Sequence, residues 1–102
     1  MISRHWKGIS ALDQGDAYVN HLRAETIPAL TRIPGFVRAS ILRRDVPNGT
    51  EFQIITVWES LDAIRSFAGQ DAELAVVPPA VRKMMVEFEG RATHYEVVHA
   101  TP

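Results

Sequence analysis

The sequence contains no cysteine, and this absence removes several kinds of site at once. Disulfide bonds, thiolate metal sites and thiol nucleophiles are all excluded. The six glycines are dispersed and form neither a GxGxxG nor a Walker pattern, so a glycine-rich phosphate loop is not indicated. Nucleotide, flavin and other cofactors are therefore not expected.

Long apolar runs and basic clusters are also missing. Residues 1–7 have no apolar core of the kind that a signal peptide needs, and no window approaches the length of a membrane span. The 11 lysines and arginines are balanced by 12 acidic residues, and the densest basic cluster, Arg43 and Arg44, has no interleaved aromatic residues. We therefore expect a cytoplasmic protein that contacts neither a membrane nor nucleic acid.

The bulk composition is that of an ordinary globular protein. Hydrophobic residues make up 46% of the 102 residues and charged residues 23%, so disorder is not expected. Without repeats, low-complexity tracts or a linker, the sequence predicts a single domain over residues 1–102. A chain of this size can build one core, but dimerisation helps it to bury surface.

The most informative segment is a predicted strand with two apolar faces. Phe52, Ile54 and Trp58 lie on one face, and Ile55 and Val57 lie on the other. A half-exposed strand would alternate apolar and polar residues, so this pattern predicts burial on both sides. The predicted helices can cover only one side of a small sheet. We expect a second copy of the chain to cover the other by sheet-to-sheet packing.

Periodicity and turn residues predict the order strand, helix, strand, strand, helix, strand. As two interleaved crossover units, this order gives an α+β, ferredoxin-like βαββαβ fold with a four-stranded antiparallel sheet and its helices on one face. Ser60 and Gly69 are suited to cap the second main helix. The expected elements are a strand over 2–9, a helix from Asp13 interrupted near Glu25 by Pro28, strands over 36–46 and 52–58 joined by a hairpin at 47–49, a helix over 61–68, a short helix from Asp71, a helical turn from Pro79 that carries Phe88, and a strand over 92–98.

Several short motifs carry a resemblance that runs nearly end to end. They are Arg4-x-Trp6-x-Gly8, Pro34-Gly35, Val57-Trp58-Glu59-Ser60 followed by Phe67-Ala68-Gly69, Val77-x-Pro79, and His94-Tyr95-Glu96-Val97. Together they resemble the antibiotic biosynthesis monooxygenase family. The resemblance implies a dimeric α+β barrel, in which two sheets pack face to face and a ligand cavity lies between each sheet and its own helices. Similar barrels are associated with cofactor-free oxygenation of polyphenols, haem breakdown and lactone isomerisation, so residues must decide the activity.

Cofactor-free oxygenation needs a base for a phenolic proton, a cation that holds the anion, and a dry apolar pocket. His94 is the candidate base, because it titrates near neutral pH and has Glu96 on the same face of its strand, whereas Tyr95 points to the opposite face. Arg4 or Arg38 is the candidate anion holder. The candidate apolar walls are Trp6, Trp58 and Phe67.

Each of these residues also has a purely structural interpretation. His94 can be satisfied in the dimer interface or by Glu96, the tryptophans can fill the core, and the arginines can be surface or interface cations. Haem is disfavoured, because the resemblance implies an iron-ligating histidine on the second helix and no histidine lies between His21 and His94. Neither His21 with Glu25 nor His94 with His99 has an obvious third ligand, so no metal site is expected.

The sequence thus favours a homodimer that binds a small apolar or aromatic molecule and oxygenates it without a cofactor. Two alternatives stay open. One is a non-enzymatic dimer that binds or buffers a ligand or serves a stress-related role, and the absence of a convergent set of titratable residues favours it. The other is an isomerase or decarboxylase on the same scaffold.

Overall fold

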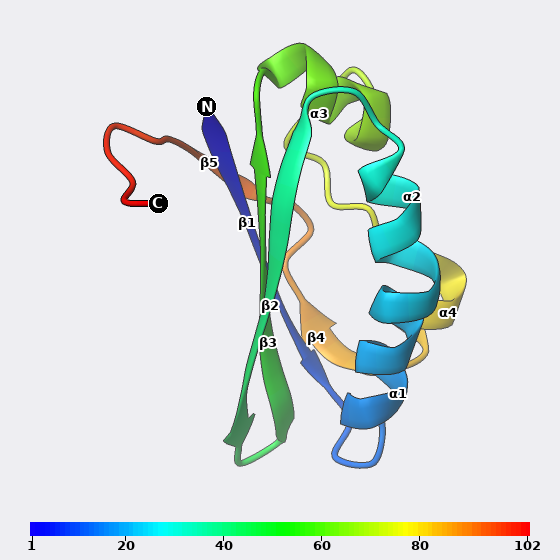
Figure 1. Cartoon of the computed structure of the whole chain (residues 1–102). Coiled ribbons are helices and arrows are strands. Elements are labelled where there is room, and N and C mark those ends of the chain that lie inside the picture. Colours follow the sequence, from blue (N-terminus) through cyan, green and yellow to red (C-terminus); the bar gives the residue numbers. More distant parts are fainter.

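One antiparallel sheet carries all the helices on one side, and the C-terminal tail leaves on the other (Figure 1). The computed structural model describes all 102 residues. The elements in chain order are β1 Ile2–Ser10, α1 Gly15–His21, the π-helix η1 Leu22–Thr26, α2 Ile27–Thr31, β2 Phe36–Val46, β3 Gly49–Trp58, α3 Leu61–Ala68, α4 Pro79–Arg82, β4 Met85–Phe88 and β5 Thr93–Glu96.

The sheet has the order β2-β3-β1-β4, and β5 also pairs with β1. The last strand of the ferredoxin-like arrangement is therefore divided into two pieces, β4 and β5, which lie one after the other along the same edge of β1. This topology confirms the predicted α+β class and the strand order that two interleaved crossover units give. The hairpin between β2 and β3 also falls where the Pro47-Asn48-Gly49 turn predicts it.

The strand register decides which residues face the helices. Arg4 pairs with Thr56 and Trp6 pairs with Ile54 across β1 and β3, while β5 places His94 opposite Arg4 from the other side. Cross-strand partners share a face of the sheet. Thr56, Arg4 and His94 therefore form one polar row that runs across the helix-covered side.

This polar row separates two buried clusters. The first consists of Trp6, Tyr18, Leu22, Phe52, Val77, Val81 and Ala92. The second consists of Leu30, Trp58, Ala63, Ile64 and Ala72. Thr56 lies between Ile54 and Trp58 on β3, and Arg4 lies in the matching position on β1, so the two clusters do not merge into one core.

The first long helix is continuous but irregular, as Pro28 predicts. Proline lacks the backbone N–H, and its ring clashes with the carbonyl four residues earlier. The chain accommodates it with the π-helical η1 between α1 and α2, and Pro28 lies in the first turn of α2. The predicted interruption near Glu25 is therefore a wide helical turn rather than a break.

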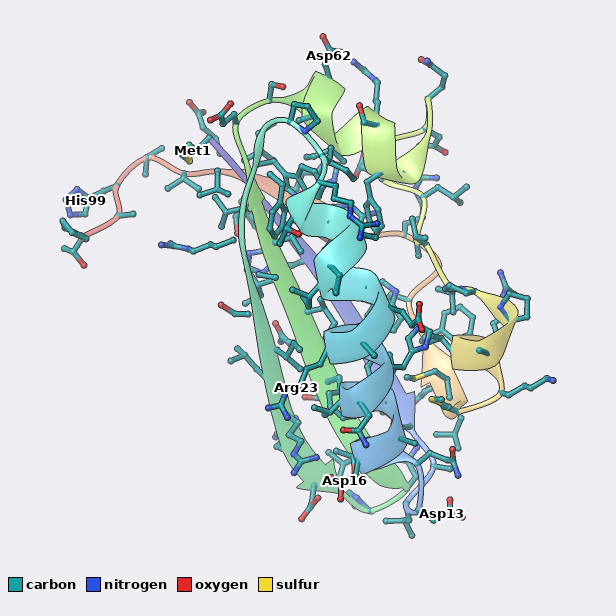
Figure 2. The ribbon with its side chains drawn as sticks, turned by 45° about the vertical axis from the view of Figure 1, so that its right-hand side comes forward. Met1, Asp13, Asp16, Arg23, Asp62 and His99 are labelled. Carbon is teal, nitrogen blue, oxygen red and sulfur yellow. The ribbon has the colours of Figure 1, made fainter.

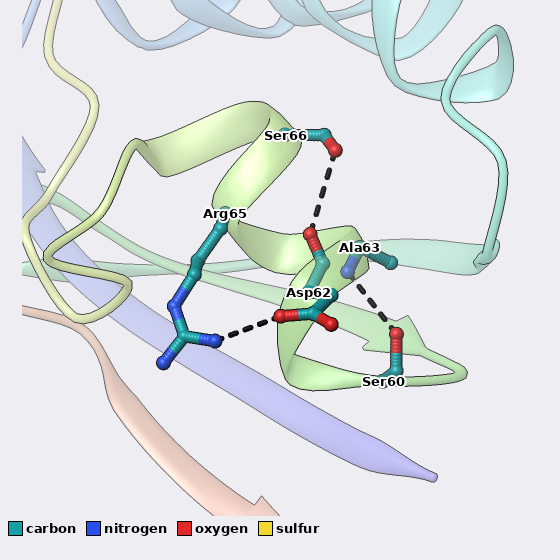
Figure 3. Close-up of polar contacts among 5 residues, drawn as sticks. All are labelled: Ser60, Asp62, Ala63, Arg65 and Ser66. Carbon is teal, nitrogen blue, oxygen red and sulfur yellow. Dashed lines mark hydrogen bonds and ion pairs between the residues drawn. The ribbon is translucent and has the colours of Figure 1, made fainter.

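The second main helix, α3, has the predicted bounds and caps. The Ser60 hydroxyl accepts a hydrogen bond from the backbone N–H of Ala63 at 3.1 Å (Figure 3). Gly69 follows the last helical residue with φ 90°, a conformation that favours glycine. The exposed pair between Arg65 and Asp62 in the same view adds little, because solvent screens it.

One helical prediction in the C-terminal half is wrong, and a second is correct only at its start at Pro79. No helix begins at Asp71; instead, residues 73–75 pair with residues 90–92 through two backbone hydrogen bonds and an isolated bridge between Leu74 and Arg91. The helical turn from Pro79 ends at Arg82, and Met85–Phe88 forms β4 against Gly8, Ile9 and Ser10 of β1. Pairing with residues distant in sequence determines the structure of both segments. Local hydrophobic periodicity cannot predict such pairing. No helix in the chain combines the length and apolar character needed to cross a membrane.

The other side of the sheet carries no helix. Ile55 and Val57 lie on this outer face, as the sequence pattern predicts, together with the half-exposed Leu42. His5 and Tyr95 also lie there, with their rings edge to face at 4.9 Å between centroids. Val57 is already buried within the single chain, whereas Leu42 and Tyr95 are half-exposed and Ile55 is partly exposed, so the chain leaves part of this apolar and aromatic face uncovered.

Replacing Gly49 by alanine should destabilise the fold. Gly49 opens β3 with φ 157°, and an added Cβ would collide with the backbone carbonyl oxygen of Ser10. We expect Gly49→Ala to lower the free energy of unfolding by about 2–3 kcal/mol in urea denaturation. Gly90→Ala is the matched control, because a Cβ there meets nothing within 4 Å. Equal effects of the two substitutions would contradict this account.

Candidate functional site

A small cavity lies between the sheet and the long helix, in the gap between the two core clusters. Its volume is about 60 Å³, which is room for a few water molecules and well below the roughly 300–1,000 Å³ typical of ligand sites. Most of the lining is hydrophobic, and Val76 and Pro78 on its rim are exposed. At this volume the cavity cannot hold a whole aromatic molecule.

Larger hollows lie on the surface, where α1 meets the β2–β3 hairpin. They measure about 480 and 420 Å³, but they are open grooves with few hydrophobic residues. Asp13 and Asp16 mark this end of the molecule (Figure 2), and Asp16 pairs with Arg43 at 2.8 Å. Such grooves do not fit an aromatic ligand, because a ring needs apolar walls. The small internal cavity is therefore the better candidate site despite its size.

Arg4 supplies a buried positive charge to the cavity wall. Its side chain is almost fully buried, with 5% of the residue exposed, and its guanidinium lies 5.5 Å from the centre of the Phe67 ring. One Nη donates to the Leu74 carbonyl at 2.8 Å, but Nε is buried without a partner and no carboxylate pairs with the group. Burial lowers the pKa of Arg4, yet an arginine stays protonated at neutral pH. The wall thus carries an uncompensated cation.

His94 lies beside Arg4 rather than in the cavity lining. Its Nε2 is buried without a partner. Burial lowers the pKa of His94, and the charge of Arg4 lowers it further, while Glu73 acts in the opposite direction. The imidazole is therefore neutral at pH 7 with a free ring nitrogen. The predicted pairing with Glu96 does not form, and Glu96 is exposed.

The three predicted aromatic residues have different positions. Trp6 and Phe67 line the cavity, and the Trp6 indole donates to the Glu89 carbonyl at 2.8 Å. Trp58 is fully buried behind them, stacked on Phe67 with 5.9 Å between ring centroids. Its indole N–H donates to the Thr56 hydroxyl at 2.8 Å. Trp58 therefore positions Phe67 and Thr56 instead of contacting the cavity itself.

Arg38 does not reach the cavity. Phe36 pairs with Trp58, but Arg38 pairs with Val57, so Val37 is the extra residue of a β-bulge. The bulge moves Arg38 to the outer face, where it is exposed. Of the two arginines predicted to hold an anion, the structure brings only Arg4 to this site.

Tyr18 and Thr56 are among the cavity residues that were not predicted as site residues. Tyr18 is 3% exposed and lines the cavity from α1, and burial raises the pKa of its phenol. Its place on the apolar face of the predicted helix was a usable signal. Thr56 lines the cavity from β3, where it interrupts an otherwise apolar alternation. That interruption is the sequence mark of the polar row.

Residues 69–78 form the segment that covers Arg4. Asp71 and Arg91 join this segment to the connection between β4 and β5 through two parallel 2.8 Å hydrogen bonds, and the hydrogen bond from Arg91 lowers the pKa of Asp71. The segment lies between α3 and α4, pairs with residues 90–92 through its own residues 73–75, and buries Ala72 and Val77 in the two core clusters. Across the molecule, no group of three or more His, Asp or Glu side chains is arranged to hold a metal ion.

Residues 12–78, more than half of the chain, match the family of antibiotic biosynthesis monooxygenases. The chain belongs to this family. The matched region runs from the turn before α1 to the segment that covers Arg4. The comparison with functionally curated proteins found no match.

Solved structures confirm the fold of this family member. It is similar to SnoaB, a cofactor-independent oxygenase from Streptomyces nogalater in its N63A form, with 20% identity, coverage of 99% and 96% of the two chains and a TM-score of 0.67. It is also similar to a candidate antibiotic biosynthesis monooxygenase from Nitrosomonas europaea, with 16% identity, 99% and 93% coverage and a TM-score of 0.71. The heme-degrader MhuD from Mycobacterium tuberculosis shares 18% identity, with 100% coverage of both chains and a TM-score of 0.62. At these identities the likeness shows the fold alone.

Removing the buried charge should stabilise the protein. Arg4→Met keeps a long flexible side chain but removes an unpaired cation and its unpartnered Nε. We expect a gain of about 1 kcal/mol in the free energy of unfolding, seen as a higher melting temperature in circular dichroism. Arg38→Met on the exposed outer face should change stability by less than about 0.5 kcal/mol. A destabilised Arg4→Met protein would show that the guanidinium has a structural role.

Proposed function

We propose that this protein is a cofactor-independent monooxygenase that acts on a small phenolic or quinol-type molecule in the cavity between sheet and helices. The observation that carries the proposal is the buried, unpaired guanidinium of Arg4 in a cavity with the aromatic walls Trp6 and Phe67. A site that keeps a cation without a counter-charge is prepared for an anion. The family membership and the likeness to a cofactor-independent oxygenase support the same reaction class.

In this mechanism His94 removes the phenolic proton and Arg4 holds the resulting phenolate. The neutral imidazole has a free nitrogen to accept the proton, and the Nε–H of Arg4 has a free donor for the oxyanion. The electron-rich ring then reacts with dioxygen in a dry environment. One oxygen atom enters the ring as a quinone oxygen and the other leaves as water. The phenol supplies all four electrons, so no external reductant is needed.

Substrate entry requires the cavity to open. The covering segment, residues 69–78, is the element to move, because its rim residues Val76 and Pro78 are exposed and Leu74 is half-exposed. The Leu74 carbonyl is the hydrogen-bond acceptor that Arg4 uses in the closed state. A phenolate that competes for Arg4 would release this contact as it binds.

A non-enzymatic ligand-binding protein is the second candidate. It is favoured by the position of His94, which lies beside Arg4 and not among the cavity-lining residues. Binding would then use the apolar walls and the cation without proton transfer. An isomerase or decarboxylase would use the same acid–base pair without dioxygen.

Oxygen consumption with a panel of hydroquinones and phenols tests the proposal. Wild-type protein should consume oxygen, and His94→Gln should lower kcat/KM by about a hundredfold or more. His21→Gln is the matched control, because His21 lies at the end of α1 and does not line the cavity. Ligand-induced thermal shifts without oxygen consumption would favour the binding protein, and full activity of His94→Gln would remove His94 from the mechanism.

The pH profile provides an independent check. A base must be unprotonated, and the pKa of His94 is lowered from the ordinary 6.5 by burial and by Arg4. We expect kcat/KM to be flat around pH 7 and to fall on the acid side, with an apparent pKa below 6.5. This acid limb should disappear from the residual activity of His94→Gln, and an unchanged limb would assign it to another group.

We also propose that the protein is a homodimer joined through the outer faces of two sheets, where Ile55 and Leu42 would be covered. Size-exclusion chromatography with light scattering should give twice the 11.4 kDa mass of the chain. Ile55→Glu should produce a folded monomer, because a carboxylate would be buried in the interface. Leu12→Glu is the control, since Leu12 is 74% exposed and lies in the turn after β1. A monomeric wild-type protein at micromolar concentration would contradict the dimer.

A further inference from the structure

Two nitrogen atoms in this chain are buried side-chain groups without any hydrogen-bond partner. They are Nε of Arg4 and Nε2 of His94. Arg4 on β1 pairs directly with His94 on β5, so the two side chains leave the same face of the sheet as neighbours. Native proteins satisfy nearly all such groups. Two unsatisfied nitrogens on adjacent residues therefore indicate a missing partner, and a single acceptor satisfies both when His94 carries a proton on Nε2.

The chain offers no acceptor of its own to this pair. None of the four ion pairs in the structure includes Arg4 or His94. Glu73, on the covering segment, influences His94 only through its charge, and Glu96, on the same face of β5, is exposed. Arginine has donors only, and a protonated histidine has donors at both ring nitrogens. The missing partner is therefore an acceptor-only, negatively charged group, and a carboxylate meets both requirements.

We propose that the site binds aromatic carboxylates, with the carboxylate accepting hydrogen bonds from Arg4 Nε and His94 Nε2 and the ring packing against Phe67 and Trp6. The inference rests on the proposed function for the location of the site, and it deepens that function by naming a second ligand class. It does not require oxygenation. Because both nitrogens are covered in the closed state, the ligand enters as the segment over residues 69–78 moves away from Arg4.

Binding of a carboxylate should take up a proton. The groups that face His94 are Arg4 from β1, Glu73 from the covering segment and Glu96 from its own strand. In the free protein Arg4 favours the neutral imidazole, whereas a bound carboxylate would favour the imidazolium. A phenol brings its own proton to His94, but a carboxylate is already ionised at neutral pH. Carboxylate affinity should therefore rise as pH falls toward the pKa of free His94, by up to about tenfold per pH unit.

Isothermal titration calorimetry with benzoate and benzamide tests this proposal, because the two probes share a ring and differ in charge. Benzoate should bind at least tenfold more tightly than benzamide at pH 7. Titrations in phosphate and in Tris, which differ in ionisation enthalpy, should report uptake of about one proton per bound benzoate. Benzoate should also slow oxygen consumption competitively if the proposed oxygenation occurs.

Substitutions distinguish the contributions of Arg4 Nε and His94 Nε2 to benzoate binding. Arg4→Met should abolish the preference for benzoate, and Arg4→Lys, which keeps the charge but lacks Nε, should weaken benzoate binding at least tenfold. His94→Gln should keep part of the affinity but lose the proton uptake. His21→Gln at the end of α1 and Arg32→Gln after α2 are the matched controls and should behave as wild type, because neither residue lines the cavity or lies on the sheet. Circular dichroism melts identify any variant that fails to fold.

Three results would overturn the proposal: no benzoate binding at millimolar concentration, equal binding of benzoate and benzamide, or proton uptake that persists in His94→Gln. Its failure is distinguishable from failure of the proposed function. Benzoate binding with proton uptake but no oxygen consumption would sustain the carboxylate site and refute the oxygenase. Oxygen consumption that benzoate does not inhibit would sustain the oxygenase and refute the carboxylate site.

Discussion

A cation that is buried without a counter-ion divides the core on the covered side of the sheet into two parts. Arg4 is held by the Leu74 carbonyl and by the face of the Phe67 ring, and neither contact neutralises its charge. A hydrophobic residue at this position would join the two core clusters into one. The chain instead keeps a gap between them, which is the cavity. A hydrophobic side chain in place of Arg4 would thus favour stability but would fill the cavity.

Much of this architecture could be predicted from the sequence, because local chemistry determines it. The caps at Ser60 and Gly69 define α3, and Pro28 marks the irregular turn of the first helix. Strand alternation also placed Trp6 and Arg4 on one face of β1. The predictions that were wrong concern segments whose structure depends on residues distant in sequence. Met85–Phe88 forms a strand because it pairs with the free edge of β1.

The positions of the site residues also depend on features that the sequence does not predict. A single extra residue, Val37, moved Arg38 to the opposite face, and no sequence pattern announces such a bulge. The neighbourhood of His94 was equally hidden, because Glu96 is close in sequence whereas Arg4 and Glu73 are close in space. Similar folds include a cofactor-independent oxygenase and a heme-degrader, so the fold does not choose the chemistry. The residues of the polar row must do so.

The π-helical turn over Leu22–Thr26 has an evolutionary consequence. Both of its end residues contribute to the cavity wall, and such a turn holds one residue more than a regular α-helix needs. Loss of that surplus residue would return the segment to ordinary helical geometry and rotate the preceding face by about 100° relative to α2. A one-codon deletion could therefore remodel the wall opposite Arg4 while every strand of the sheet keeps its pairing.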